Sequence, residues 1–265
     1  MAWTSRHRDR GLAGAGLALL VTGLVACSKH QPEIVQGECR PLHGADICVW
    51  GEVSGNTLVA FGATVPVGSV ENAPAEAPMV WPPVVAATIH LPEVVKAATG
   101  FDNLRIFWEA HGHPPGPYLV PHFDFHFYTV PAADVAAIDC ADSTKPGELP
   151  AAYELPDVSI PQIGNLIGLC VPAMGMHSLL GAELHAPTTF QKTMVVGYYH
   201  GRPIFIEPMI TRATLLERRG FPLAIPDVPG RPANVRYPTR FRADYDSTAQ
   251  AYKFVFSDLM GAGAR

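Results

Sequence analysis

The sequence predicts a mainly β (α+β) fold, an antiparallel sandwich or barrel built of hairpins with two or three short helices. Three observations lead to this class. Proline (26) and glycine (24) are frequent in the 265 residues, and only 16% of the residues are charged, which favours strands and loops over a helical bundle. Between His122 and Phe127, polar and apolar residues alternate as they do in a half-buried strand.

The first 26 residues resemble the signal peptide of a bacterial lipoprotein. Three arginines precede an apolar run, Gly11–Val25, that is too short to span a membrane comfortably. The run ends in the lipobox Leu-Val-Ala-Cys, whose Cys27 would become the lipidated, palmitate-bearing first residue. Ser28 is typical of lipoproteins sent to the outer membrane, which places the protein on its periplasmic face if the host is Gram-negative. The alternative is an ordinary secretory signal with a chance cysteine.

The rest of the chain is expected to form a tether over residues 27–46 and a single mainly β domain over residues 47–265. Removing residues 1–26 takes away three arginines and one aspartate, which leaves 16 basic and 23 acidic side chains and a net charge of −7. A surface of this charge attracts neither nucleic acid nor anionic lipid headgroups. The N-terminal lipid itself would therefore attach the protein to the membrane.

Four cysteines remain once Cys27 carries the lipid. An even number in an oxidising compartment suggests two disulfides. Of the three pairings, we expect Cys39–Cys48, which closes a short loop, and Cys140–Cys170, which closes a longer one. Buried free thiols are the alternative, and a thiolate metal site is not favoured because no two cysteines have the CxxC spacing.

The other elements follow from periodicity and turn residues. The expected strands are 47–53, 57–65, 84–90, 104–111, 122–127, 190–199, 203–207, 237–243 and 251–257. The expected helices are 92–99, 131–139 and 211–219, with Gly100 and Gly220 as caps of the first and third. An irregular lead-in over 28–46 and loops over 67–83, 141–161 and 221–238 complete the chain.

The segment Phe107–Thr129 gathers four histidines, an aspartate and a glutamate. Because successive side chains of a strand point to opposite faces, its phenylalanines would enter a core while His122, Asp124 and His126 share the other face. The simplest hairpin register about the proline-rich loop places His111 opposite His122 and Glu109 opposite Asp124.

This arrangement predicts a metal site. Imidazoles on alternate residues can converge on one ion, so His111, His113 and His122 are the expected ligands. Asp124 would be a fourth ligand or would orient an imidazole. His126 is four residues from His122, about 13 Å in a flat strand, and would reach another element. A hydrogen-bonded network without metal is the alternative.

The expected cofactor is a divalent transition metal, zinc first and copper second. His177 is a further candidate ligand, and the nearby Met174 and Met176 offer thioethers that suit copper, although methionines more often fill gaps in a core. Glu207 ends the apolar run 204–206 and needs a partner if it is buried, for example a metal, a histidine or Arg212.

The expected chemistry is zinc-type hydrolysis or hydration. A three-histidine zinc with an open position lowers the pKa of its water to about 7. Glu109 and Glu207 are the candidate catalytic residues, as base or orienting groups. The sequence contains no GxSxG, P-loop, dinucleotide or CxxC motif.

Three stretches are similar to an uncharacterised family of exported bacterial proteins, whose domain has no established reaction. They are HGHPPGPYLVPHFDFHFY (111–128), VPAMGMH (171–177) and VVGYYHGRPIFIEPMIT (195–211). The resemblance implies a mostly β domain that can assemble into oligomers. It also implies that the seven polar residues of these motifs share one neighbourhood: His111, His113, His122, Asp124, His126, His177 and Glu207. Ser178 departs from the family, whose members carry an aromatic residue there.

Two other functions fit the same sequence. One is a metal-free binding module whose aromatic side chains hold an apolar ligand of unknown identity: Phe107, Trp108, Phe123, Phe125 and Phe127. The other is an oligomeric assembly protein of the cell envelope. Bound metal, a co-purified lipid or a large particle would distinguish the three functions.

Overall fold

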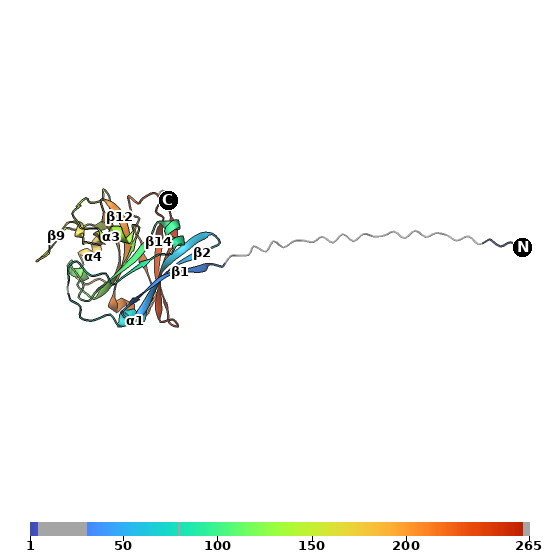
Figure 1. Ribbon diagram of the computed structural model, residues 1–265, viewed down its shortest axis with the longest axis horizontal. Coiled ribbons are helices and arrows are strands. Elements are labelled where there is room, and N and C mark those ends of the chain that lie inside the picture. Colours follow the sequence, from blue (N-terminus) through green and yellow to red (C-terminus); the bar gives the residue numbers. More distant parts are fainter. Residues whose placement is uncertain (5–30, 79, 262–265) are drawn as a thin grey trace. The chain divides into compact units, whose positions relative to one another are not determined.

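The structure is a computed structural model that describes residues 1–4, 31–78 and 80–261 (Figure 1). The lipobox with Cys27 lies outside the described residues. Residues 31–261 all belong to one folded unit, and the description below concerns this unit. Within the described part of the chain, no helix has both the length and the apolar composition needed to cross a membrane.

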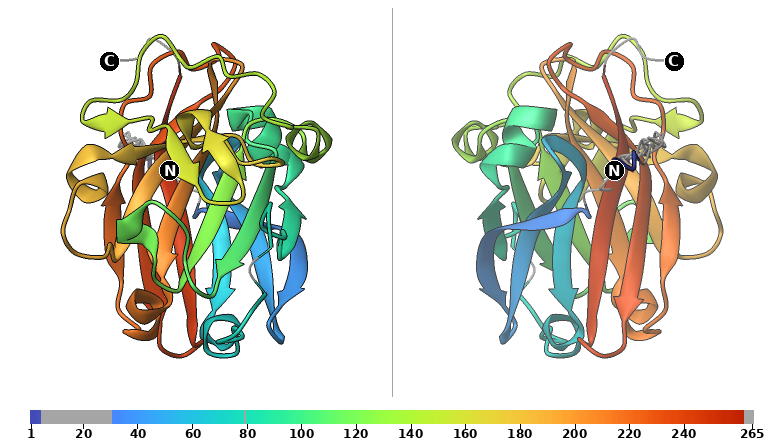
Figure 2. Two further views of the ribbon diagram at one scale, coloured as in Figure 1. Left: turned by 90° about the vertical axis from the view of Figure 1, so that its left-hand side faces the viewer. Right: turned by 90° about the vertical axis from the view of Figure 1, so that its right-hand side faces the viewer.

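Two antiparallel sheets form the unit, which confirms the mainly β class and favours the sandwich. The first contains, in spatial order, β1 (Glu33–Leu42), β2 (Ala45–Ser54), β3 (Thr57–Pro66), β15 (Ala251–Met260), β14 (Tyr237–Asp246) and β13 (Phe221–Ala224). The second contains β4 (Ala87–His90), β5 (Asn103–Glu109), β6 (His122–Tyr128), β12 (Arg202–Thr211), β11 (Lys192–Tyr199), β10 (Met176–Leu180) and β7 (Tyr153–Glu154). The right-hand view of Figure 2 shows the blue and cyan strands beside the red ones, so the first sheet joins both ends of the folded chain.

Short helices and one small hairpin connect these strands. The α-helices of the described residues are α1 (Val67–Glu71), α2 (Glu93–Thr99), α3 (Ala132–Ala136), α4 (Gly181–Leu184) and α5 (Arg212–Leu216). Single 3₁₀ turns form η1 (Gly116–Tyr118) and η2 (Ile167–Leu169). The hairpin of β8 (Val158–Ile160) and β9 (Gly164–Leu166) is a separate two-stranded sheet.

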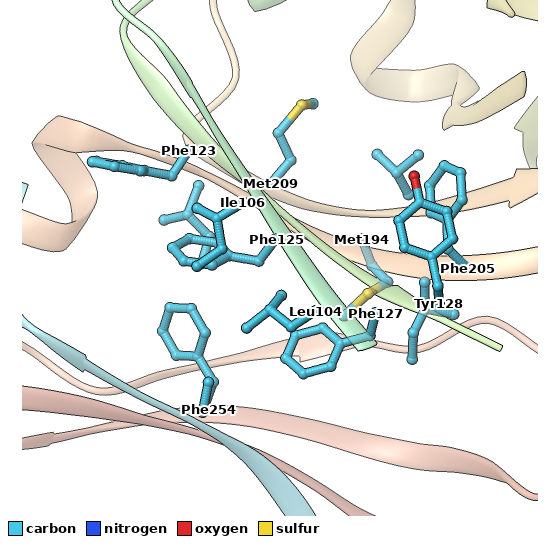
Figure 3. Close-up of a cluster of buried hydrophobic side chains, with 14 of the residues drawn as sticks. Leu104, Ile106, Phe123, Phe125, Phe127, Tyr128, Met194, Phe205, Met209 and Phe254 are labelled. Atoms are coloured by element: carbon cyan, nitrogen blue, oxygen red, sulfur yellow. The ribbon is translucent and has the colours of Figure 1, made fainter. Parts of the chain in front are cut away.

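Aromatic side chains fill the space between the two large sheets. Phe125 packs against Phe254 with ring centroids 4.9 Å apart, and Phe127 packs against Phe256 at 4.8 Å. Figure 3 shows Phe123, Phe125 and Phe127 of β6 in this cluster. The expected alternation along β6 is therefore confirmed, since its phenylalanines face the other sheet. These three rings do not line the cavity described below, so they do not form the apolar ligand site that the sequence allowed.

Most of the expected hairpins and helices are present. The hairpins β2–β3, β11–β12 and β14–β15 form as predicted, and Gly100 ends α2. The hydroxyl of Thr211 accepts a hydrogen bond from the Thr214 N–H and so begins α5. The helix expected to extend to residue 219 ends at Leu216, so Gly220 is not its cap.

Three expected loops contain strands. Glu33–Leu42 was expected to be irregular, but it forms β1 and pairs with β2. β13 lies within the expected loop 221–238, and β7 and β8 lie within 141–161. β1 and β13 are edge strands of their sheet, and most side chains of β1 are exposed. An exposed edge strand needs no alternating apolar residues, so its sequence resembles a loop.

Both expected disulfides are confirmed. Cys39 and Cys48 face each other in the β1–β2 pair and bond across it. Cys140 and Cys170 join the segment after α3 to the residue that follows η2. Two disulfides fit an exported protein, because cytosolic thiols are kept reduced.

Candidate metal centre

The register of β5 against β6 decides which polar side chains meet. Glu109 lies opposite His122 and Phe107 opposite Asp124, so the expected pairing of Glu109 with Asp124 is wrong by two residues. β5 ends at Glu109, and the loop that follows folds onto itself instead of extending the hairpin. Gly112 makes this possible: its φ is +68°, and a Cβ there would lie 2.2 Å from the Tyr118 carbonyl oxygen.

The folded loop separates the two histidines of the HGH motif. His111 is exposed, has its Nε2 3.7 Å from Glu76 Oε2, and is not among the residues whose donor atoms converge. His113 turns inward, and its Nε2 lies 3.9 Å from Asp124 Oδ2. The structure therefore places His113, and not His111, with His122 and Asp124.

His113, His122 and Asp124 form the first group of donor atoms, all within 4.8 Å of one another. His122 and Asp124 are adjacent residues on one face of β6, and His122 Nε2 lies 3.2 Å from Asp124 Oδ1. The side chain of His122 is 0% exposed and that of Asp124 5%, whereas His113 closes the group from the loop at 29%.

The second group consists of His126, His177 and Glu207, whose donor atoms also lie within 4.8 Å of one another. His126 is the next residue after Asp124 on the same face of β6, and Glu207 is on the neighbouring strand β12. His126 Nε2 is 3.4 Å from Glu207 Oε2 and 3.3 Å from His177 Nε2. His126 thus reaches other elements, as its distance from His122 requires.

Gly197 and Phe205 position the second group across the sheet. His177 of β10 pairs with Gly197 of β11, which pairs with Phe205 of β12. A Cβ on residue 197 would lie 1.8 Å from the Phe205 ring, so only glycine leaves room for this ring over the sheet. The ring contacts both imidazoles, with centroids 4.8 Å from His126 and 5.1 Å from His177.

Three of the four imidazoles are held in one tautomer by the backbone. His113 Nδ1 lies 2.8 Å from the Pro114 carbonyl oxygen, His122 Nδ1 2.6 Å from that of Val120, and His177 Nδ1 3.1 Å from that of Leu169. A carbonyl only accepts hydrogen bonds, so each Nδ1 carries a proton. In the neutral ring the Nε2 lone pair then faces the site, as in histidines that bind metals.

Four polar atoms of the two groups are buried without a hydrogen-bond partner: His122 Nε2, Asp124 Oδ1, His126 Nδ1 and Glu207 Oε2. His122 Nε2 and Asp124 Oδ1 are 3.2 Å apart, yet their orientation is not that of a hydrogen bond. Buried polar atoms are rarely left unpaired, and an ion is one of the explanations for such a cluster.

Burial keeps three of the imidazoles neutral. Loss of hydration lowers the pKa of His113 and of His126, and it lowers that of His177 to about 4. For His122 burial acts in the same direction, but the neighbouring Asp124 carboxylate outweighs it and raises the pKa. The same pair lowers the pKa of Asp124 to about 2, because the nearby charge of His122 favours the ionised carboxylate against the burial that opposes ionisation.

The other two carboxyl groups are shifted the opposite way. Burial, followed by the charge of Asp124, raises the pKa of Glu109 to about 8. Burial and the adjacent Asp124 also raise the pKa of Glu207 well above its usual value. The lowered pKa of His126 and the raised pKa of Glu207 both oppose an ion pair across their 3.4 Å contact in the absence of a cation.

The distances between donor atoms match those around a tetrahedral ion. Zinc binds imidazole nitrogen and carboxylate oxygen at about 2.0–2.1 Å, which separates two ligand atoms of a tetrahedron by about 3.3 Å. In the second group the two distances from His126 Nε2 are 3.3 and 3.4 Å. In the first group His122 Nε2 is 3.2 Å from Asp124 Oδ1, whereas His113 Nε2 is 3.9 Å from Asp124 Oδ2, which is longer than the tetrahedral value.

A cavity of about 50 Å³ opens beside both groups. It has room for about three water molecules. Its polar wall is made by Glu109, His113, Asp124, His177 and Glu207. Its other walls are largely apolar: Trp81, Pro83, Pro114, Ile160, Leu166, Leu169, Val171, Met174, Leu179, Val195 and Met209. A small reactant and water could therefore meet the donor atoms away from bulk solvent.

The structure changes the role of one arginine that the sequence suggested and adds a second arginine near the site. Arg212 donates to the carbonyl oxygens of Val70 and Glu71, so it does not neutralise Glu207. Arg105, which sequence reasoning missed, lies opposite His126 and donates to the Ala173 carbonyl oxygen. A lone arginine inside the apolar run 104–108 was the available signal, because a buried charge needs a specific partner.

The donor types define what the site can do. Two imidazoles and a carboxylate in each group are the ligands of zinc sites that keep a position open for water, and the same donors suit copper. The identity of the ion depends on geometry and supply as well as on these atoms. A comparison of this chain with protein-family models, with curated proteins and with solved structures found no match.

Proposed function

We propose that this chain is an exported, lipid-anchored metalloprotein of the cell envelope, in which His126, His177 and Glu207 bind a divalent transition metal. The observation that carries this proposal is the convergence of two imidazole nitrogens and a carboxylate oxygen, all buried and within 4.8 Å of one another, with His126 Nε2 only 3.3 and 3.4 Å from the other two atoms. Without a cation, Glu207 Oε2 has no partner there. The lipobox, the two disulfides and the resemblance to exported bacterial proteins support the location.

Zinc is the first candidate ion and copper the second. Imidazole and carboxylate at these distances fit a tetrahedral zinc site with one position open. Met174 and Met209 line the same cavity, and a thioether approaching the ion would favour copper.

The reaction class that fits best is hydrolysis or hydration of a small substrate. A metal in this group would polarise a water molecule and lower its pKa to about 7. Glu109 lines the same cavity and is outside both groups of donor atoms, so it is the candidate to take a proton from that water once it is ionised, which in the metal-free protein requires a pH above about 8. The cavity is far smaller than the roughly 300 Å³ of a typical ligand pocket, which argues against a bulky apolar ligand.

Metal analysis tests the proposal. The full chain, expressed with its signal sequence and purified in detergent, should contain zinc or copper by mass spectrometry. His177→Ala should contain less metal than the wild-type chain, because it removes a donor from the second group. His111→Ala is the matched control and should keep the metal, since this imidazole lies outside both groups. A chain that stays metal-free at saturating zinc and copper would overturn the proposal.

A variant of Glu109 tests the proposed reaction separately from metal binding. Glu109→Gln should retain the metal and lose turnover of small carbonyl compounds or carbon dioxide, because an amide cannot accept the proton. Loss of metal in this variant would instead make Glu109 a ligand. Unchanged turnover would remove it from the mechanism.

The anchor is tested separately. Cys27→Ser should abolish incorporation of radiolabelled palmitate and release the processed chain from the membrane fraction, because the lipid provides the attachment. If the variant chain is still labelled and still sediments with membranes, the lipobox has been misread.

A further inference from the structure

Two sets of ligands, and not one, lie on this face of the sheet. His122 and His126 are both on β6 and four residues apart, about 13 Å along an extended strand, so one ion cannot bind both. Each nevertheless has its own second imidazole and its own carboxylate. The spacing of His122 and His126 along β6 therefore separates the donor atoms into two groups.

The first group has the same features as the second. The Nδ1–H groups of His113 and His122 are held by backbone carbonyls, so both Nε2 atoms face Asp124. His122 Nε2 and Asp124 Oδ1 are buried and close, but they are not aligned for a hydrogen bond with each other. Two ligands of one ion have this relation, because each directs its lone pair at the metal and not at its neighbour.

The two groups also lie side by side. Asp124, in the first group, pairs with Met209 of β12, which is two residues from Glu207 of the second group, so the two carboxyl groups lie close together on one face of neighbouring strands. Both carboxyl groups, together with His113 and His177, line the one cavity. Two acids at this separation repel each other when both are ionised, unless cations lie beside them.

We propose that both groups bind a divalent metal at the same time, with the carboxylates of Asp124 and Glu207 between the two ions. This inference rests on the proposed function and extends it from one ion to a two-metal centre. Such centres place their ions about 3.5–4 Å apart and hold a water between them, which the adjoining cavity can supply. The substrate class that follows is a small molecule with an oxygen atom that can bind both ions, such as a carbonyl or oxyanion group.

Counting the ions distinguishes the inference from the proposed function. The full chain, purified in detergent, stripped with chelator and dialysed against zinc, should contain two zinc ions per chain by mass spectrometry. One zinc per chain would overturn the two-metal inference and leave the proposed function standing. No zinc would overturn both.

Variants assign the two ions to the two groups. His113→Gln alters a partly exposed ligand on the loop, so it should fold and retain one zinc. His177→Ala should also retain one zinc, and the double variant none. His111→Gln, two residues from His113 in the same loop, should retain two. Two zinc ions in His113→Gln would remove His113 from the ligand set and overturn the assignment.

A spectroscopic readout reports how close the ions are. With copper(II) in place of zinc, the wild-type chain should give the electron paramagnetic resonance spectrum of a spin-coupled pair, because the two ions share adjacent carboxylates. His113→Gln should give the spectrum of an isolated ion. Two uncoupled signals in the wild type would show separate sites and would overturn the shared centre.

Discussion

At the scale of single residues, backbone carbonyls orient three histidines of the candidate metal centre. Pro114, Val120 and Leu169 each accept the Nδ1–H of one imidazole and so fix which nitrogen faces the site. The spacing of histidines in the sequence does not show which backbone carbonyls will accept these hydrogen bonds. The donor set therefore depends on backbone conformation as much as on residue type.

Glu109→Gln should make the metal-free protein less sensitive to rising pH. Burial raises the pKa of Glu109 to about 8 from a usual value of 4.5. The folded state then keeps a proton that the unfolded chain has lost, so this stability is fully present below about pH 4.5 and is lost as the pH rises through about 8. Urea unfolding in chelator should show a smaller decline between these limits for the variant, and equal declines would contradict the prediction.

The sequence could predict which side chains share a face but not which of them meet. Alternation along His122–Phe127 was sufficient to separate the phenylalanines from His122, Asp124 and His126. The choice between His111 and His113 depended on the loop after β5, where Gly112 lets the chain turn back onto Tyr118. Such a loop conformation is set by contacts within the folded loop, which residue spacing does not encode.

At the scale of elements, the site depends on an irregular segment that covers the sheet. The residues around η2 supply Leu169, whose carbonyl holds His177, and Cys170, which is bonded to Cys140. The alternation of apolar residues and the turn residues between them predicted the long strands in the centre of each sheet. The same signals missed β1, β7, β8, β9, β10 and β13, because strands that are exposed or only a few residues long have too little periodic pattern to recognise.

Removing the Cys140–Cys170 disulfide should weaken metal binding. The bond fixes the residue next to Leu169, whose carbonyl orients the His177 ring. Loss of such an orienting partner typically lowers metal affinity by about 10–100-fold. Competition with a fluorescent zinc chelator should show this decrease for the variant with alanine at both positions.

The second disulfide provides the matched control for this experiment. Cys39–Cys48 joins two strands of the other sheet, far in the topology from β6, β10 and β12. Its removal should lower the free energy of unfolding, by about 2–4 kcal/mol for a typical disulfide, and leave the zinc affinity unchanged. An equal loss of zinc affinity in both variants would mean that general destabilisation, and not the Leu169 carbonyl, is responsible.

At the scale of the whole molecule, the core and the metal centre lie on opposite faces of one sheet. The phenylalanines of β6 pack against the other sheet, whereas Asp124 lines the cavity and His122 and His126 belong to the two groups of donor atoms beside it. We therefore expect the core and two disulfides to fold the chain without metal, unlike a small zinc domain that unfolds when its ion is removed. Metal should add to the stability of a protein that is already folded.

Zinc should consequently raise the unfolding temperature without being required for folding. A ligand at 100 times its dissociation constant stabilises the folded state by about 2.7 kcal/mol. For a chain of this size, 1 kcal/mol shifts the unfolding temperature by roughly 2–4 °C, so saturating zinc should raise it by roughly 5–11 °C. Differential scanning calorimetry of the chelator-treated chain, with and without zinc, measures the shift.

The histidine variants show whether this shift comes from the proposed ligands. His111→Ala should retain the full shift, because its exposed imidazole lies outside both groups of donor atoms. His177→Ala should lose part or all of it, and circular dichroism before heating should show that the variant is folded, since the core is on the other face of the sheet. If the chelator alone unfolds the wild-type chain, the core does not fold independently of the metal and the separation of the two faces is wrong.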